Sequence, residues 1–128
     1  MRLLNKGERG QEMVEAALVL PVLLLLFLSL LETGKVIYSY NTLAHAAREG
    51  ARYGSTHPDD TAGIRAKVLA RAIALNAADL TITVTPLAGP AVRVQITYPH
   101  RLITGQLIRA IGGNPVINLT TSTTMHVE

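Results

Sequence analysis

An uninterrupted apolar run near the N-terminus constrains this chain more than any other feature. The run covers residues 16–31, reads AALVLPVLLLLFLSLL and contains no charged side chain. As an α-helix it rises about 24 Å, whereas the hydrocarbon core of a bilayer is about 30 Å thick and needs about 20 residues to cross. A full span, residues 13–34, therefore takes in Glu15 and Glu32. The run predicts a helix that ties the chain to a membrane or to similarly apolar surroundings.

Three interpretations of the run compete: a cleaved secretory signal, an ordinary membrane anchor, and the N-terminal helix of a filament subunit. A secretory signal ends in small residues at its cleavage site, but the run is followed by ETGK, which has no such pattern. An ordinary anchor tolerates an acidic residue near its edge, because the leucine-rich middle offsets the cost. The basic leader, with Arg2, Lys6 and Arg9, predicts that the N-terminus stays cytoplasmic.

Composition argues against several function classes. The net charge is only +3 with five aromatic residues, which is not the clustered basic and aromatic pattern of a nucleic-acid-binding protein. The chain has no cysteine, and its four histidines do not have metal-ligand spacing. No nucleophile–base pair or phosphate-binding loop is visible. We therefore expect no enzyme, no metal site, no cofactor and no nucleic-acid partner.

Two carboxylates precede the apolar run, Glu12 and Glu15. Acidic side chains suit the first turn of a helix because the N-terminal end of the helix dipole is positive. On position alone, this is the simpler interpretation of both residues. The alternative is that Glu15 is a recognition and docking carboxylate that becomes buried during assembly.

Two longer strings resemble a known family. RGQEMVEAALVLPVLLLL covers residues 9–26, and YSYNTLAHAAREGARYG covers residues 38–54. Both resemble TadE-like proteins, which are pilin-like (pseudopilin) subunits of the bacterial tight adherence, or Flp-type, pilus system. The resemblance is strong over residues 9–54, and the rest of the chain agrees only in pattern.

The resemblance implies cleavage by a prepilin peptidase after a glycine, with a glutamate at the fifth position of the mature chain. In this sequence the glycine is Gly10, the new N-terminus is Gln11 and the fifth residue is Glu15. It also implies a location in the bacterial inner (cytoplasmic) membrane, crossed once with the C-terminus outside, and in a surface filament after assembly. The implied partners are the membrane and other pilin-like subunits or copies of the chain.

The helical pattern continues beyond the run to about Gly54, so we expect one helix over residues 12–54. Pro21 removes a backbone hydrogen bond inside it and predicts a kink or local melting. Ala46, Gly50 and Gly54 form a small-residue series that lets another helix approach closely. The partner is either the chain's own second helix or a neighbouring subunit.

The C-terminal part predicts a small α+β domain. After a loop, Asp59 or Asp60 caps a helix over about residues 61–78. Alternating residues then predict three strands, the second ended by Pro99, with a possible helical turn at residues 106–111. Three antiparallel strands with one apolar face would cover the outer half of the long helix. The expected strands are 80–86, 91–98 and 116–127.

The expected domain organisation is a leader, a filament-core or membrane helix, its extracytoplasmic continuation, and the α+β domain. Their ranges are 1–10, 11–34, 35–54 and 55–128. The expected function is that of a structural subunit of a bacterial surface filament, assembled through its hydrophobic helix. The alternative is a membrane-anchored assembly or binding module that never polymerises.

Overall fold

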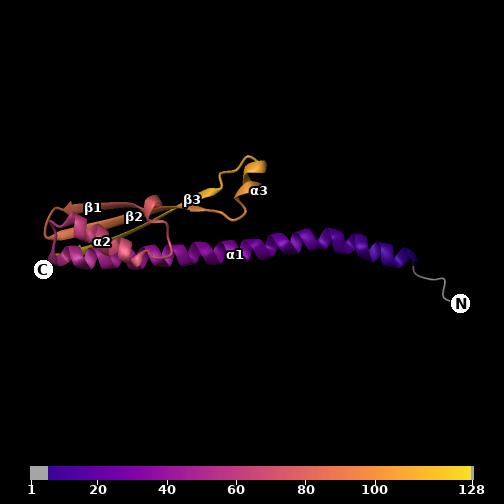
Figure 1. Cartoon of the computed structure of the whole chain (residues 1–128), viewed down its shortest axis with the longest axis horizontal. Helices are drawn as coiled ribbons and strands as arrows, with labels where there is room; N and C mark the ends of the chain where they lie inside the picture. The colour runs from indigo at the N-terminus through magenta and orange to yellow at the C-terminus, as the bar shows by residue number, and fades with distance from the viewer. Residues whose placement is uncertain (1–5, 128) are drawn as a thin grey trace.

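A single long helix organises the molecule. The computed structural model describes residues 6–127, with side chains from residue 9 onward. Helix α1, Lys6–Thr56, is 51 residues long, and Figure 1 shows it running the length of the molecule, with α2 and the strands beside its C-terminal half and α3 beside its middle. The expected start at residue 12 was too late, because α1 already includes residues 6–10 of the expected leader. Residues 1–5 of that leader lie outside the described residues.

The apolar run lies inside α1, and Pro21 does not interrupt it. Local melting, one of the two outcomes expected there, does not occur. Figure 1 shows a shallow bow in the N-terminal half of the helix. Proline removes one hydrogen bond and crowds the preceding turn, but the flanking turns continue the helix on both sides.

A tight corner joins α1 to helix α2, Thr61–Arg71. Asp60 caps α2 by accepting a hydrogen bond from the backbone amide of Gly63 at 2.9 Å. The hydroxyl of Tyr53, on α1, donates to the other oxygen of the same carboxylate at 2.8 Å. One side chain therefore starts the second helix and fastens it to the first.

Helix α2 ends at Arg71, seven residues before the expected end at residue 78. Its buried residues, Ile64 and Val68, recur every four positions and continue to Ala72, but Ile73 is 87% exposed. Further helix would bury nothing more. The chain instead turns, and the side chain of Asn76 caps a short 3-10 helix, Ala77–Asp79, by accepting from the amide of Ala78.

The three expected strands form one antiparallel sheet in the order β1-β2-β3. Strand β1 is Thr81–Leu87, β2 is Ala91–Arg101 and β3 is Val116–His126. Gly89, with φ of +105°, makes the turn between the first two strands. Between β2 and β3 the chain leaves the sheet to form the short helix α3, Gly105–Ala110.

Pro99 does not end the second strand, contrary to expectation. Strand β2 continues to Arg101 and pairs there with β3, with Pro99 opposite Asn118. The first strand has already stopped, because its pairing with β2 reaches only Thr97. Past that point β2 has one neighbour instead of two, and a residue without an N–H is tolerated on an open strand edge.

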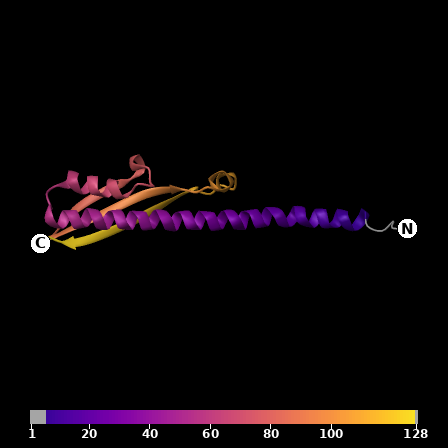
Figure 2. The ribbon, with the colours of Figure 1, turned by 60° about the horizontal axis from the view of Figure 1, so that its bottom comes forward.

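The core lies between the two helices and one face of the sheet, an α+β arrangement as expected. Figure 2 shows α1 and α2 on the same side of the three strands. The opposite face of the sheet is polar and exposed. The fully or almost fully buried apolar residues are Leu43, Ala46, Ala47, Ala51, Ile64, Val68, Ala72, Val92, Val94, Ile96 and Leu119.

Candidate functional site: the exposed half of α1 and its junction with the domain

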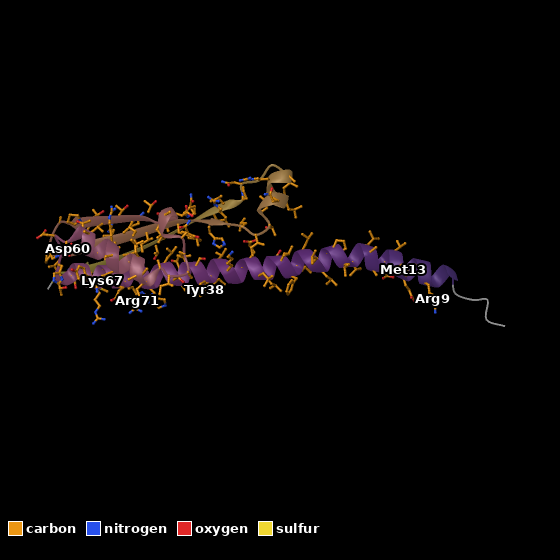
Figure 3. All side chains as sticks on the ribbon, in the orientation of Figure 1. Arg9, Met13, Tyr38, Asp60, Lys67 and Arg71 are labelled. Atoms are coloured by element: carbon orange, nitrogen blue, oxygen red, sulfur yellow. The ribbon has the colours of Figure 1, made fainter. Side chains whose placement is uncertain are left out.

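The N-terminal half of α1 carries a large apolar surface that contacts nothing else in the molecule. It belongs to one helix long and apolar enough to cross a membrane, and none of its most apolar stretch is buried. Leu18, Leu24 and Leu30, for example, are 70%, 59% and 72% exposed. Figure 3 shows that the side chains on α1 between Met13 and Tyr38 are almost entirely carbon. In water such a surface would carry a heavy free-energy cost.

Three residues singled out at the start of this surface lie on the first turns of α1. Gly10, Gln11 and Glu15 are all exposed within continuous helix. Nothing lies within 4 Å of where a Cβ of Gly10 would be. Gln11 and Glu15 are four residues apart and so share one face of the helix. Among the described residues, Glu15 forms no ion pair.

The small-residue series faces the chain's own domain. A Cβ on Gly50 would lie 2.5 Å from Cγ2 of Val68 on α2, and one on Gly54 would lie 3.0 Å from Cδ1 of Ile64. Ala46 is completely buried. Of the two partners considered for this series, α2 is the one that Gly50 and Gly54 contact, together with Val94 and Val92 of β2. The same residues are therefore not free to receive a neighbouring subunit.

A junction that the sequence analysis missed lies just after the apolar run. The carboxylate of Glu32 accepts hydrogen bonds from the amides of Ile103, at 2.9 Å, and Thr104, at 3.1 Å. The hydroxyl of Thr104 donates to it as well, at 3.4 Å. Glu32 thus clamps the segment before α3 onto α1, across about 70 residues of sequence. Bonds to a charged acceptor are roughly twice as strong as neutral ones.

The only sequence signal for this clamp was a carboxylate directly after a long apolar run, and the nearby Lys35, three residues on, was an equally plausible partner for it. From sequence alone, Glu32 counts only as a cost to membrane insertion. Its partners are backbone amides, which any residue can supply. Nothing in the string Ile103-Thr104 could therefore have identified them.

Behind the clamp lies a buried histidine, His100, which is only 3% exposed. Its Nδ1 is 3.4 Å from the hydroxyl of the buried Ser39, and its Nε2 is 3.9 Å from Glu32, too far for a hydrogen bond. Burial lowers the pKa of His100 below 6.5, Lys35 lowers it further, and Glu32 opposes both. The imidazole is therefore neutral at neutral pH, and its contact with Glu32 is not an ion pair there.

Metal-binding clusters of three or more His, Asp or Glu side chains do not occur in the part of the chain that the structure describes. What the arrangement offers is an apolar helix surface with a carboxylate near its start and a domain clamped at its end. These are features of anchoring and packing.

The comparisons with known proteins agree with this geometry. Residues 10–52 match the family model described as TadE-like protein. No curated protein and no solved structure matches the chain. The match begins at Gly10, includes Glu15, the whole apolar run and Glu32, and ends within the last turns of α1. Residues 10–52, about a third of the chain, are thus similar to TadE-like proteins, and the helix they belong to is long and apolar enough to cross a membrane.

Proposed function

We propose that this protein is a structural subunit of a bacterial surface filament of the tight adherence type. It inserts into the inner membrane with its N-terminus inside, is cleaved by a prepilin peptidase between Gly10 and Gln11, and packs through the N-terminal half of α1. The observation that carries the proposal is the exposed apolar surface of this half, within a TadE-like segment. A bilayer covers that surface before assembly, and the helices of other subunits cover it afterwards.

The position of Glu15 supports the proposal. It lies on an exposed helix turn whose neighbours Ala16, Ala17 and Leu18 are apolar and exposed. When helices pack around such a turn, an unpaired carboxylate becomes strongly destabilising, whereas a paired and hydrogen-bonded one is tolerated. Cleavage after Gly10 creates an α-amino group on Gln11 that can supply the pairing charge from a neighbouring subunit.

Shearing of surface filaments from the source cells tests the proposal. The N-terminal residue of this protein is determined in the filament fraction and in the membrane fraction. We expect Gln11 in the filaments. Detection of the protein only in the membrane, beginning with Met1, would contradict both cleavage and polymerisation.

Two single substitutions make the test specific to Glu15. Glu15→Ala is expected to reduce incorporation into filaments at least tenfold while membrane levels stay the same, because loss of a buried pair costs several kcal/mol. Glu12→Ala is the matched control, since Glu12 lies three residues earlier on the same exposed helix. Equal incorporation of both variants would mean that Glu15 is only a helix-end residue.

A second candidate is a membrane-anchored assembly or binding module that never polymerises. It is favoured by the packing of Gly50 and Gly54 against the chain's own α2 and β2 and by the complete burial of Ala46, since this leaves that series unable to bind another subunit. Under this candidate the protein stays in the membrane fraction, whether or not residues 1–10 are removed.

A further inference from the structure

The segment between β2 and β3 forms a lobe, residues 102–115, that projects beyond the sheet. Its neck is closed by a hydrogen bond from the amide of Leu102 to the carbonyl of Pro115, at 2.9 Å. Figures 1 and 2 show the lobe, with α3, extending alongside α1 toward the N-terminal half of that helix. The lobe is therefore the part of the domain nearest the apolar run.

Glu32 fixes the height of the lobe along α1. This residue follows Leu31, the last residue of the apolar run, and holds the amides of Ile103 and Thr104. The run rises about 24 Å, which is less than the thickness of the hydrocarbon core, about 30 Å. When α1 spans the membrane, the residues directly next to the run therefore lie at the interface between hydrocarbon and headgroups. A lobe attached at Glu32 then lies at the level of the lipid headgroups.

The surface of the lobe has the chemistry of that layer. Three large apolar side chains project from it, Ile103, Leu107 and Ile111, which are 49%, 52% and 81% exposed. Gly112, with φ of +82°, ends α3 directly after Ile111. Arg109 and Arg101, the last residue of β2 directly before the lobe, line a recess of about 500 Å³ together with Ile103. Residues 102–115 contain no acidic side chain, so the lobe is both apolar and basic.

The exposed tyrosines of α1 support the same placement. Tyr38 and Tyr40 are 60% and 46% exposed, about two turns beyond Glu32 (Figure 3 labels Tyr38). Amphipathic rings are enriched where hydrocarbon meets water. The interface therefore coincides with the stretch of α1 that carries the lobe.

We propose that the lobe is a membrane-contacting foot: Ile103, Leu107 and Ile111 insert into the interface, and Arg101 and Arg109 bind the phosphate groups of anionic phospholipids. These lipids belong to the bilayer that α1 spans, in the leaflet that faces the C-terminal domain. Apolar burial and attraction to anionic lipids together drive such shallow binding. The inference rests on the membrane insertion within the proposed function and is independent of filament assembly.

The absence of cysteine from the native chain makes a clean test possible. Spin labels are placed on single cysteines at Ile111→Cys, Leu24→Cys and Thr83→Cys in the full chain, with one copy per lipid nanodisc. Positions 111, 24 and 83 report the foot, the apolar run and the exposed face of the sheet. Collision with oxygen and with a water-soluble nickel complex then gives the depth of each label.

We expect the label at position 111 to collide several-fold less with the nickel complex than the label at position 83. Replacing Arg101 and Arg109 by Gln should raise this collision rate in nanodiscs containing phosphatidylglycerol, and much less in phosphatidylcholine alone.

Three outcomes would contradict the proposal. If the label at position 111 is as accessible to the nickel complex as the label at position 83, while position 24 lies in hydrocarbon, the foot alone is overturned. Protection of position 111 only when several copies share a nanodisc assigns the surface to a second subunit and also overturns it. An aqueous label at position 24 overturns the foot together with membrane insertion.

Discussion

Single residues at the junction hold α1 and the domain in register. Glu32 has three donors on one carboxylate, two of them backbone amides. Those amides belong to the chain between β2 and α3, where no sheet or helix partner satisfies them. The position of the lobe, residues 102–115, therefore depends on the side chain of Glu32. Removing this side chain should lower the local stability of the lobe more than the stability of the whole domain.

Glu32→Ala is expected to loosen the lobe selectively. Hydrogen bonds to a charged group contribute about 1.5–3 kcal/mol, so the amides of Ile103 and Thr104 should exchange with deuterium roughly tenfold to a hundredfold faster. Amides of the central strand β2 should change little. Thr33→Ala is the control, since Thr33 bonds only within its own helix, to the carbonyl of Ser29. Unchanged exchange at Ile103 and Thr104 would refute the clamp.

His100 should make stability depend on pH. Its pKa is lowered in the fold, by burial first and by Lys35 second, from 6.5. The unfolded chain therefore binds the proton more readily, and the contribution of His100 to stability is complete above pH 6.5 and is lost as pH falls through the folded pKa. Denaturant unfolding at several pH values should show this slope in the native chain and a smaller one in His100→Gln.

Lys35→Gln provides the second arm of the pH experiment. Removing this positive charge should raise the pKa of His100, because Lys35 is one of its two lowering causes. The shift can be followed in the ring resonances of His100. A pKa that falls in this variant would show that Lys35 does not act on the imidazole as the structure indicates.

At the scale of elements, the packing of α1 against α2 depends on the missing side chain of Gly50. A Cβ there would meet Cγ2 of Val68 at 2.5 Å, so α2 has to shift or repack. We expect Gly50→Ala to destabilise the domain by about 1–3 kcal/mol, despite the higher helix propensity of alanine. Thermal unfolding in detergent measures the loss.

A double substitution separates this clash from other effects. Val68→Ala removes the atom that Gly50→Ala strikes, so the pair should be less destabilising than the sum of the single changes. Gly34→Ala is the matched control, since nothing lies within 4 Å of its Cβ position. Strict additivity of Gly50→Ala and Val68→Ala would contradict the close approach.

The elements also show what a sequence can and cannot predict. Periodicity identified the long helix, the second helix and all three strands, because burial on one face repeats with the period of each element. It placed the end of α2 seven residues too late, since Ile73 and Leu75 continue an apolar pattern but Ile73 remains exposed. It also ended β2 at Pro99. A proline is tolerated there because β1 stops pairing with β2 at Thr97, and the point where this pairing stops cannot be read from the sequence.

Of the candidate site, the apolar run could be singled out from sequence, because its chemistry is local. The docking role of Glu15 follows from the family resemblance and stays a prediction. The Glu32 clamp could not be singled out, because it joins a side chain to backbone amides far along the chain. The partner of Gly50 was left open for the same reason. Small residues predict close approach, but they do not say which helix approaches.

The whole molecule consists of a domain built on the C-terminal half of α1 and an N-terminal half that the domain does not need. The buried apolar residues of α1 begin at Leu43, and the nearest apolar residue packed against them toward the N-terminus is Val36. Nothing in the core comes from residues 9–31. The apolar half is thus available for a membrane or for other subunits without loss of the fold.

A fragment of residues 28–128 should therefore fold on its own in water. It keeps Glu32 and the entire core, and it loses most of the exposed apolar surface, so we expect a monomer with cooperative thermal unfolding. A shorter fragment, residues 35–128, keeps the core but loses Glu32, and should differ mainly through fast amide exchange at Ile103 and Thr104. An unfolded or aggregated 28–128 fragment would show that the apolar half stabilises the domain, so that its release into a membrane or filament could not leave the fold intact.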